Sequence, residues 1–478
     1  MKNKKFKKRY LLFLFPLLAG IFLFIALLSG DGTSLAEVLI GAEDGEELTG
    51  GNKFFLVGAI ALPILLLLLS LLVVYRCYAT KYEKPDPNAK KDYVIADMAT
   101  AKGDFLASGT VKSDKKEDNT SRFFMLTQTD LKMANKPKPH FNDTLTLKEL
   151  CERFRNFAAS RLGLYYEESD IRQFIAGLSV SHILIMQGMS GTGKTSLAYA
   201  FGEFLQNKST IVPIQPMWKE RTDLIGYYNE FTKKFNETVL LQKMYEANYS
   251  DELYVTVLDE MNIARVEYYF AEFLSLLEIP NPEGRYLDVV TDKKPKDPKL
   301  LKNGQLKLPT NMWFIGTANN DDSTFAISDK VYDRAMIMNL DKKSTWFEAP
   351  ETGGVKLSIK RWEQLVKRAK SEYKLTHRNR KRIRKLDEYM IENFHITFGN
   401  RIMKQINSYV PVLIACGGTE LEAIDDILSK KVLRKLEAQN PIYVRNSAEG
   451  LKSYLDEVFG QDKMPRCKAY LTHLERNA

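Results

Sequence analysis

The residues best suited to chemistry in this chain lie in one glycine-rich stretch, GMSGTGKTS, at residues 188–196. Glycines at this spacing let consecutive backbone N–H groups converge on phosphate oxygens, and the positive end of a following helix strengthens that attraction. We expect the ammonium group of Lys194 to reach the β- and γ-phosphates of a nucleotide, and the hydroxyl of Thr195 to bind Mg²⁺. The residues expected to touch the nucleotide are Gly188, Met189, Ser190, Gly191, Thr192, Gly193, Lys194, Thr195 and Ser196.

The elements around this stretch fit the same chemistry. An apolar run at residues 183–186 predicts a short buried strand that breaks into the glycine turn and then a helix. This context and the spacing Gly-x4-Gly-Lys-Thr satisfy the P-loop pattern in full. A structural glycine turn beside a buried lysine gives no reason for Lys194 and Thr195 to stand together.

Two carboxylates form the next candidate group. Asp259 and Glu260 follow an apolar run at residues 253–258, which predicts a strand that ends in both acids. Open α/β sheets bind ligands at the carboxyl ends of their strands. We expect Asp259 to hold Mg²⁺ through water, and Glu260 to orient and deprotonate the water that attacks the γ-phosphate. Such a pair also occurs in solvated loops, but its place after a strand favours the catalytic interpretation.

Two further predicted strands carry polar residues at their ends. Residues 312–317 lead into Asn319, and residues 335–340 follow Arg334. Asn319 is suited to sensing the γ-phosphate or placing water, and Arg334 to neutralising charge on the phosphoryl group of a neighbouring subunit. Asn319 as a helix cap and Arg334 in a surface ion pair are the alternatives, and residue chemistry alone does not separate them.

Length and charge limit the architecture. A chain of 478 residues suits two or three domains. Lysine and arginine total 69 against 60 aspartates and glutamates, which gives a net charge of +9. The basic residues cluster in residues 1–9 and in HRNRKRIRK at residues 377–385. The four cysteines lie far apart, which excludes a disulfide framework or a zinc framework and indicates a reducing compartment.

The amino-terminal part predicts a membrane anchor. Residues 11–29 and 54–75 are uncharged and apolar, and each is long enough to cross a hydrocarbon core of about 30 Å. The loop between them is acidic and the outer flanks are basic, so we expect both termini in the cytoplasm and a two-span, multi-pass membrane protein. A cleaved signal peptide and a buried soluble hairpin are the alternatives.

Four stretches together are similar to the AAA+ ATPases of the McrB-like, dynein-related branch. These are GMSGTGKTS, QPMWKERTDLIGYYN, LDEMNIARVEYYFAEFLSLLE and LPTNMWFIGTANND, and the similarity runs over about residues 147–436. It implies an α/β fold with a five-stranded parallel sheet in an αβα sandwich, a helical lid, and a ring that usually has six subunits. It assigns Asn319 as the first sensor and Arg334 as the arginine finger. The segment FGNRIMKQI resembles a second-sensor segment, which nominates Arg401 as a contact to the phosphates of its own chain.

The chain also departs from that branch. The restriction motor of the McrB-like branch is a GTPase. Its relatives carry M-N-x-x-D-R-[ST] at the first sensor, whereas this chain has Ser323 in place of the arginine. The prediction is therefore ATP with Mg²⁺, and GTP is the alternative. We expect the predicted membrane hairpin in place of the amino-terminal DNA-reading domain of that branch, and we expect no nuclease constellation in this sequence.

Residues 215–235 are rich in aromatic side chains. In AAA+ rings this region faces the central pore, so some of these rings are candidates to grip a partner, although aromatic residues more often pack. The basic run near residues 378–385 is typical of a solvated helix face, with anionic lipid and nucleic acid as alternatives.

The predicted layout has seven parts. They are a basic cytoplasmic amino terminus (1–9), a first membrane helix (10–30), an acidic extracytoplasmic loop (31–53), a second membrane helix (54–75), a polar cytoplasmic tether with one or two weak strands near residues 93–95 and 123–126 (76–141), an AAA+ nucleotide-binding core (142–345) and a helical lid (346–478).

The function expected from this layout is a ring-forming, membrane-anchored ATPase that remodels or moves a protein partner at the cytoplasmic membrane face. Its expected partners are copies of itself, the lipid membrane and a protein of unknown identity. One alternative is a nucleic-acid motor or defence component that recruits a separate nuclease. Another is a nucleotide-gated scaffold.

Overall fold

A computed structural model describes residues 121–137, 139–141, 144–319, 324–341 and 344–477. All of them belong to one of the two compact units of the chain, Lys115–Ala478. The predicted basic amino terminus, both predicted membrane helices, the loop between them and most of the tether lie outside the described residues.

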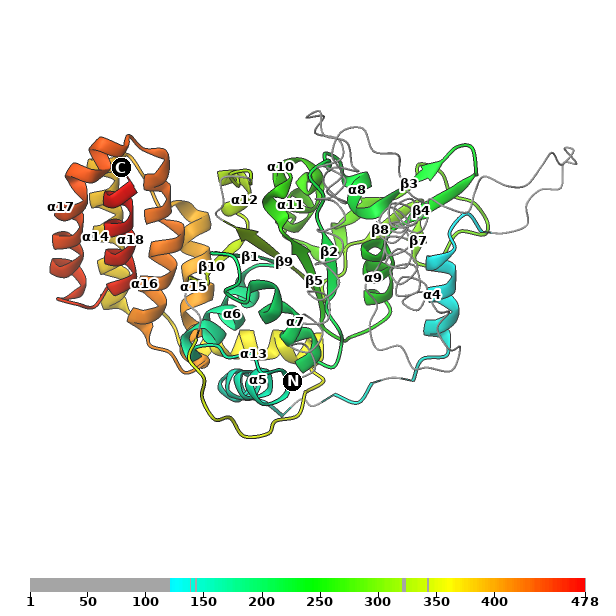
Figure 1. The fold of residues 1–478 in the computed structure, drawn as a ribbon, viewed down its shortest axis with the longest axis horizontal. Helices are drawn as coiled ribbons and strands as arrows, with labels where there is room; N and C mark the ends of the chain where they lie inside the picture. Colours follow the sequence, from blue (N-terminus) through cyan, green and yellow to red (C-terminus); the bar gives the residue numbers. More distant parts are fainter. Residues whose placement is uncertain (1–120, 138, 142–143, 320–323, 342–343, 478) are drawn as a thin grey trace, which may run out of the picture. The chain divides into compact units, whose positions relative to one another are not determined.

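A five-stranded parallel sheet forms the centre of this unit (Figure 1). Its order is β10 (Met336–Asn339), β1 (Ile183–Gly188), β9 (Met312–Asn319), β5 (Tyr254–Asp259) and β2 (Thr210–Pro213). Each neighbouring pair runs parallel. The strands are nearly continuous apolar runs because both faces of a parallel sheet are covered. The predicted five-stranded parallel sheet is confirmed.

Alternating side chains of β10, β1, β9 and β5 pack into two separate cores. Leu184 and Met186 join the core formed with α5 (Leu147–Leu162), α6 (Glu168–Val180) and α7 (Lys194–Phe204). Ile183 and Ile185 join the core formed with α9 (Val239–Ala247), α10 (Val266–Tyr269) and α11 (Ala271–Glu278). Helices therefore cover both faces of the sheet, as an αβα sandwich requires.

Two small antiparallel sheets extend this core. The hairpin of β3 (Gly226–Asn229) and β4 (Lys234–Glu237) follows α8 (Arg221–Ile225). A three-stranded sheet contains β6 (Tyr286–Asp288), β8 (Gln305–Lys307) and β7 (Leu301–Lys302). The short elements that remain are η2 (Met261–Ile263), η3 (Pro282–Gly284) and α12 (Asp329–Tyr332).

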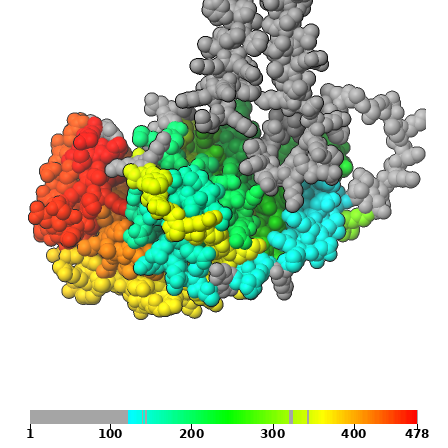
Figure 2. Space-filling model, turned by 60° about the horizontal axis from the view of Figure 1, so that its bottom comes forward, coloured from blue at the N-terminus to red at the C-terminus, as the bar shows by residue number. Residues whose placement is uncertain are grey.

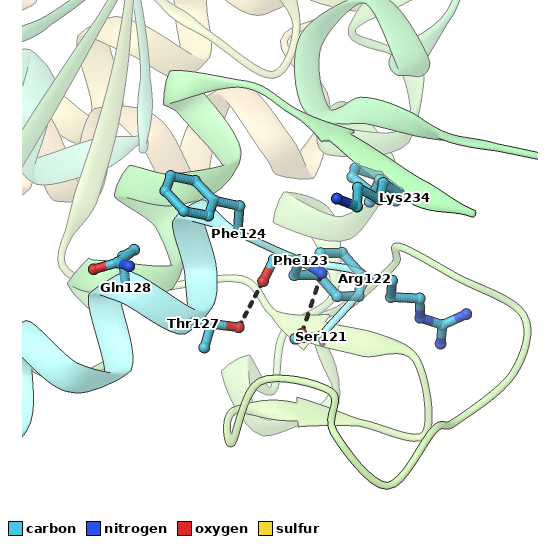
Figure 3. Close-up of a pocket in the computed structure, with 8 residues that line it drawn as sticks. Ser121, Arg122, Phe123, Phe124, Thr127, Gln128 and Lys234 are labelled. Carbon is cyan, nitrogen blue, oxygen red and sulfur yellow. Dashed lines mark hydrogen bonds between the residues drawn. The ribbon is translucent and has the colours of Figure 1, made fainter. Parts of the chain in front are cut away.

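Residues before the core form a helix instead of the weak strand expected near residues 123–126. Helix α4 (Met125–Ala134) starts where the carboxylate of Glu237 accepts the backbone N–H groups of Phe124, Met125 and Leu126, at 2.6, 2.8 and 2.8 Å. Figure 3 shows the start of this segment, which lines a cavity beside Lys234. Arg122 fixes the segment, because its buried guanidinium pairs with Asp292 at 2.7 Å and Asp297 at 2.8 Å.

The carboxyl-terminal part is helical, as predicted. Its elements are α13 (Ile359–Glu372), α14 (His377–Phe394), α15 (Gly399–Ala415), α16 (Glu420–Lys431), η4 (Leu433–Ala438), α17 (Pro441–Phe459) and α18 (Pro465–Asn477). In α14 the basic side chains Arg378, Arg380, Lys381, Arg384 and Lys385 are exposed, whereas Ile383 and Leu386 are buried. The basic run is therefore the solvated face of an amphipathic helix.

The extended segment between β10 and α13 joins the sheet core to the helical carboxyl-terminal part. It runs along the surface beside α5, drawn in yellow and teal in Figure 2. Glu351 pairs with Arg161 at 3.0 Å, and the Val355 N–H donates to the carbonyl oxygen of Phe204 at 2.7 Å. These contacts tie the segment that leads to α13 to the face of the core that carries α5 and α7.

The predicted membrane localisation requires correction. Within the part of the chain that the structure describes, no helix combines the length and apolar character needed to cross a bilayer. Helix α17, with 19 residues, is long enough but carries arginine, lysine and three acids. The predicted spans at residues 10–30 and 54–75 lie outside the described residues, and we do not retain the membrane assignment.

Candidate functional site

The glycine-rich turn lies between the end of β1 and the start of α7. Gly188, Gly191 and Gly193 have φ angles of 143°, 78° and 92°, a backbone region that favours glycine. A Cβ on Gly188 would lie 2.2 Å from the carbonyl oxygen of Leu340, so no larger residue fits there without movement. The turn therefore has the strand–turn–helix form that the sequence predicts, with the amino end of α7 directed at it.

Lys194 is held inside this turn. Its side chain is buried, and its Nζ donates to the carbonyl oxygens of Gly188 at 2.9 Å and Met189 at 2.8 Å. A buried ammonium group needs such acceptors because its desolvation is otherwise costly. The loop backbone thus encloses the positive charge at the position where a phosphate would meet it.

The side chain of Asp259 accepts hydrogen bonds from two threonine hydroxyl groups near the P-loop. Its Oδ1 accepts from the hydroxyl of Thr195 at 2.7 Å and from the hydroxyl of Thr317 at 2.8 Å. The three strands concerned, β1, β9 and β5, are parallel neighbours, so their carboxyl ends meet at one edge of the sheet. Both predicted metal ligands are therefore within hydrogen-bonding distance of each other.

The chemistry of this pair fits Mg²⁺. A hydroxyl and a carboxylate are hard oxygen donors, and Mg²⁺ usually takes few protein ligands and completes its shell with waters and substrate phosphates. Among the described residues no group of three or more histidine, cysteine, aspartate or glutamate side chains is placed to hold a metal. A Mg²⁺ ion held by Thr195 and Asp259 would take its remaining ligands from waters and nucleotide phosphates.

Glu260 is exposed at the same edge in an unusual backbone conformation. Its φ and ψ are 52° and 47°, in the left-handed region, which costs about 1–2 kcal/mol for a residue with a side chain. The hydroxyl of Thr317 accepts the Glu260 N–H at 2.9 Å and helps to hold this conformation. Strained residues of this kind cluster at functional sites.

Thr317 was not among the residues predicted from the sequence. It is buried and joins Asp259 to the Glu260 backbone through one hydroxyl. The only sequence signal is its place two residues before Asn319 in a predicted strand, where threonine is an ordinary β-former.

Asn319 also lies at this edge. It ends β9, pairs in register with Gly188, and its carbonyl oxygen accepts from the side chain of Asn262 at 2.9 Å. It does not cap α12, which starts at Asp329 after Ser328. The structure thus brings Lys194, Thr195, Asp259, Glu260 and Asn319 to one edge of the sheet.

Arg334 lies at the opposite edge. The hydroxyl of Ser181, which precedes β1, donates to the Arg334 carbonyl at 2.9 Å. A six-residue strand spans about 20 Å at about 3.3 Å per residue, so β1 separates this position from the P-loop of the same chain. The guanidinium of Arg334 pairs with Glu278 at 2.7 Å and donates to the Lys330 carbonyl at 2.7 Å.

Arg401 lies with Arg334 and not with the P-loop. Its Nη2 donates to the other oxygen of Glu278 at 2.5 Å, and its Nη1 is 3.9 Å from Asp333. Glu278 thus pairs with both arginines. The contact in cis that the sequence similarity implies for Arg401 finds no support in this arrangement.

The aromatic stretch between the two motifs divides into packed and exposed rings. Trp218 packs edge-on against Tyr269, and Phe235 stacks on Phe123. Tyr227 and Phe231 are 52% and 98% exposed, the latter in the turn between β3 and β4. Only the exposed pair remains a candidate to grip a partner.

Two family models match this chain. Residues 183–335 match the AAA domain (dynein-related subfamily), and residues 355–478 match a Domain of unknown function (DUF8727). No curated protein matches the sequence.

Solved structures are similar at low identity. One is a candidate ATPase from Cytophaga hutchinsonii, with 13% identity, a TM-score of 0.43, and coverage of 69% of this chain and 96% of that chain. Another is a full-length MCM homolog from Methanopyrus kandleri, with 12% identity, a TM-score of 0.35, and coverage of 62% of each chain.

The first family match agrees with the geometry of the sheet edge. It begins at the first residue of β1 and ends directly before β10, so it spans the P-loop, Asp259, Glu260 and Asn319. The finer McrB-like assignment stays a prediction. Over residues 183–335 the chain is similar to the AAA domain of the dynein-related subfamily, and this similarity and the geometry of the sheet edge both support a P-loop NTPase core.

Proposed function

We propose that this chain hydrolyses ATP with Mg²⁺ in a ring of its own copies and uses the energy to remodel or move a partner. The observation that carries the proposal is the convergence of Thr195 and Thr317 on Asp259, beside Glu260 and the P-loop. This is the set of groups that phosphoryl transfer to water needs, arranged at one edge of one sheet.

In the proposed mechanism Lys194 releases the carbonyls of Gly188 and Met189 and turns to the β- and γ-phosphates, while the loop N–H groups hold the remaining oxygens. Thr195 and Asp259 would hold Mg²⁺, which would neutralise charge on the phosphate oxygens.

Glu260 takes the proton of the attacking water, and Asn319 orients that water at the end of β9. Thr317 positions both carboxylates, because its hydroxyl binds the Asp259 side chain and the Glu260 backbone at the same time.

Arg334 completes the site of a neighbouring subunit. The backbone of Arg334 lies about 20 Å of strand away from its own P-loop, and Glu278 and the Lys330 carbonyl hold its guanidinium, so we propose that it is offered across a subunit interface. Arg401 shares Glu278 with Arg334, so we propose that it also faces the neighbour. Assembly into a ring is then a requirement for full activity.

The proposal is tested by steady-state ATP hydrolysis of the full chain. Glu260→Gln is expected to lose about 10²- to 10⁴-fold in rate, the usual contribution of a general base, while ATP binding persists. Glu230→Gln, which neutralises an exposed carboxylate in the β3–β4 turn, is the matched control and should retain wild-type activity. A Glu260→Gln variant as fast as wild type would show that the base is wrongly assigned.

Two further outcomes concern the alternatives. If Lys194→Ala abolishes assembly with the partner while Glu260→Gln leaves that assembly intact, the chain is a nucleotide-gated scaffold. If GTP competes with ATP at equal concentration and is turned over faster, the assigned nucleotide is wrong.

A further inference from the structure

The turn that carries Arg334 is held by side chains from the carboxyl-terminal helices. Lys431, the last residue of α16, donates from its Nζ to the carbonyl oxygen of Tyr332 at 2.5 Å and to that of Ala335. These two acceptors lie on either side of Arg334. The Lys431 side chain is buried, so its ammonium group is committed to this turn.

Two other residues hold the same turn from neighbouring elements. Gln405 in α15 donates to the carbonyl oxygen of Asp333 at 3.1 Å. Arg434 in η4 pairs with Asp329 at 2.7 Å, and its guanidinium lies 3.4 Å from the ring centre of Tyr332. The backbone from residue 332 to residue 335 is therefore fixed largely by donors from the helical part.

The turn is also connected to the strand that leads into the P-loop. The side-chain amide of Gln187 donates to the hydroxyl of Tyr332, and Gln187 directly precedes Gly188. The Arg334 turn thus contacts β1 on one side and the carboxyl-terminal helices on the other. Its backbone position depends on both.

A buried lysine bonded to backbone carbonyls is an expensive way to stabilise a fold. Removing an amino group from water costs free energy that its hydrogen bonds return only in part, and a buried apolar residue of similar size is often neutral or stabilising. The contacts of Lys431 are therefore better explained by the geometry that they impose on residues 332–335 than by stability.

We propose that Lys431 is a positioning residue for hydrolysis: it holds the backbone on both sides of Arg334 so that the guanidinium points to the nucleotide of the neighbouring subunit. The inference rests on the proposed role of Arg334 in trans. It predicts that loss of Lys431 damages the neighbour's site while the chain's own P-loop, Asp259 and Glu260 stay competent.

Subunit mixing tests this directly. Lys431→Met keeps the length and the apolar stem but removes the ammonium group, and we expect at least a tenfold lower rate of ATP hydrolysis for this variant alone. Lys194→Ala is inactive by itself but keeps a normal Arg334 turn. In a randomly mixed equimolar ring about half of the Lys431→Met subunits lie next to a Lys194→Ala subunit that offers a normal Arg334. The rate of hydrolysis per Lys431→Met subunit should therefore recover to about half of the wild-type rate.

The matched control is Lys430→Met. Lys430 is the adjacent buried lysine, but it binds Gln173 and Asp426 and not the Arg334 turn. We expect Lys430→Met to change the unfolding temperature. Its rate of ATP hydrolysis should not be restored by mixing with Lys194→Ala. Gln405→Leu provides a second variant, because it removes a donor to the same turn from another helix and should be rescued in the same way.

The outcomes separate the inference from the function on which it rests. Arg334→Ala mixed with Lys194→Ala is measured first, and a lack of rescue there refutes the trans role of Arg334. If Arg334→Ala is rescued but Lys431→Met and Gln405→Leu are not, the positioning role is refuted alone. Rescue of Lys430→Met to the same extent would also overturn it, because the effect would then be general to the lid.

Discussion

Replacement of Thr317 by valine is the sharpest perturbation of the candidate site. Valine keeps the shape of the buried side chain but lacks the hydroxyl that donates to Asp259 and accepts from the Glu260 N–H. A hydrogen bond to a charged group contributes about 1.5–3 kcal/mol, and the part-buried Glu260 N–H adds less than the cost of about 1–3 kcal/mol for a fully buried N–H without an acceptor. Because the two effects share one atom, we expect Thr317→Val to lower the free energy of unfolding by about 2–4 kcal/mol.

Thr317→Ser is the matched control. It keeps the hydroxyl and removes one methyl group, which costs about 0.8 kcal/mol of burial. Urea unfolding followed by tryptophan fluorescence measures both variants, because Trp313 lies in the same strand and is buried. The midpoint of Thr317→Val should lie well below that of Thr317→Ser.

Activity should separate the two variants further. Without the hydroxyl, Glu260 loses a bond that holds its left-handed backbone, and a loss of about 1.4 kcal/mol in its placement lowers kcat about tenfold. Thr317→Ser should keep most of the wild-type rate. The reasoning is refuted if the two variants are equally stable and active, or if the serine is the more damaging of the two.

Three other perturbations have definite outcomes. Gly188→Ala should lower the unfolding midpoint and abolish ATP binding, whereas Gly191→Ala, which points into open space, should cost only the left-handed strain of about 1–2 kcal/mol; equal effects would contradict this. Arg122→Met leaves the buried Asp297 carboxylate without its cation, so hydrogen exchange in residues 125–134 should accelerate, by an amount that corresponds to about 3–5 kcal/mol, and unchanged exchange would contradict it. Burial lowers the pKa of Lys431 to about 7, so between pH 7 and 10 the unfolded chain binds a proton that the folded chain does not. The free energy of unfolding, relative to that of Lys431→Met, should therefore rise with pH by up to about 1.4 kcal/mol per pH unit. A difference that falls or stays flat over this range would contradict the expectation.

The charges that face Lys431 support the sign of this last expectation. Arg434, Arg401 and Lys435 lower its pKa together with burial, and only Asp333 raises it. Net positive surroundings favour the neutral amine, which still donates hydrogen bonds to the two carbonyls. The change with pH is therefore expected in stability more than in the geometry of the turn.

The P-loop side of the site was predictable because its determinants are local. Glycines with positive φ, a lysine at the helix start and a threonine after it are fixed by a strand–turn–helix unit of about 20 residues. Asp259 and Glu260 followed from a general rule, since the carboxyl ends of parallel strands share one edge.

The role of Thr317 and the position of Arg401 could not be predicted from the sequence, for different reasons. The role of Thr317 depends on the register between β9 and β5, which no local pattern specifies. The position of Arg401 depends on how α15 packs against the core, where Glu278, which lies 123 residues earlier, accepts its guanidinium. The family similarity implied a contact in cis, but tertiary packing placed the side chain elsewhere.

The start of α4 shows the same limitation. Residues 123–126 have the composition of a strand, but the carboxylate of Glu237, 111 residues after Leu126, accepts three consecutive N–H groups and starts a helix. A distant acid thus sets the type of element that residues 123–126 form.

The central claim is that Lys194 and Asp259 serve one magnesium nucleotide. The most direct measurement is calorimetric binding of ATP to Glu260→Gln, with Mg²⁺ and with EDTA, repeated after addition of Asp259→Asn or Lys194→Ala to that variant. We expect Mg²⁺ to tighten ATP binding in Glu260→Gln, Asp259→Asn to remove that dependence, and Lys194→Ala to weaken binding under both conditions. Binding that depends on Mg²⁺ to the same degree after Asp259→Asn, or that is unchanged by Lys194→Ala, would contradict the claim.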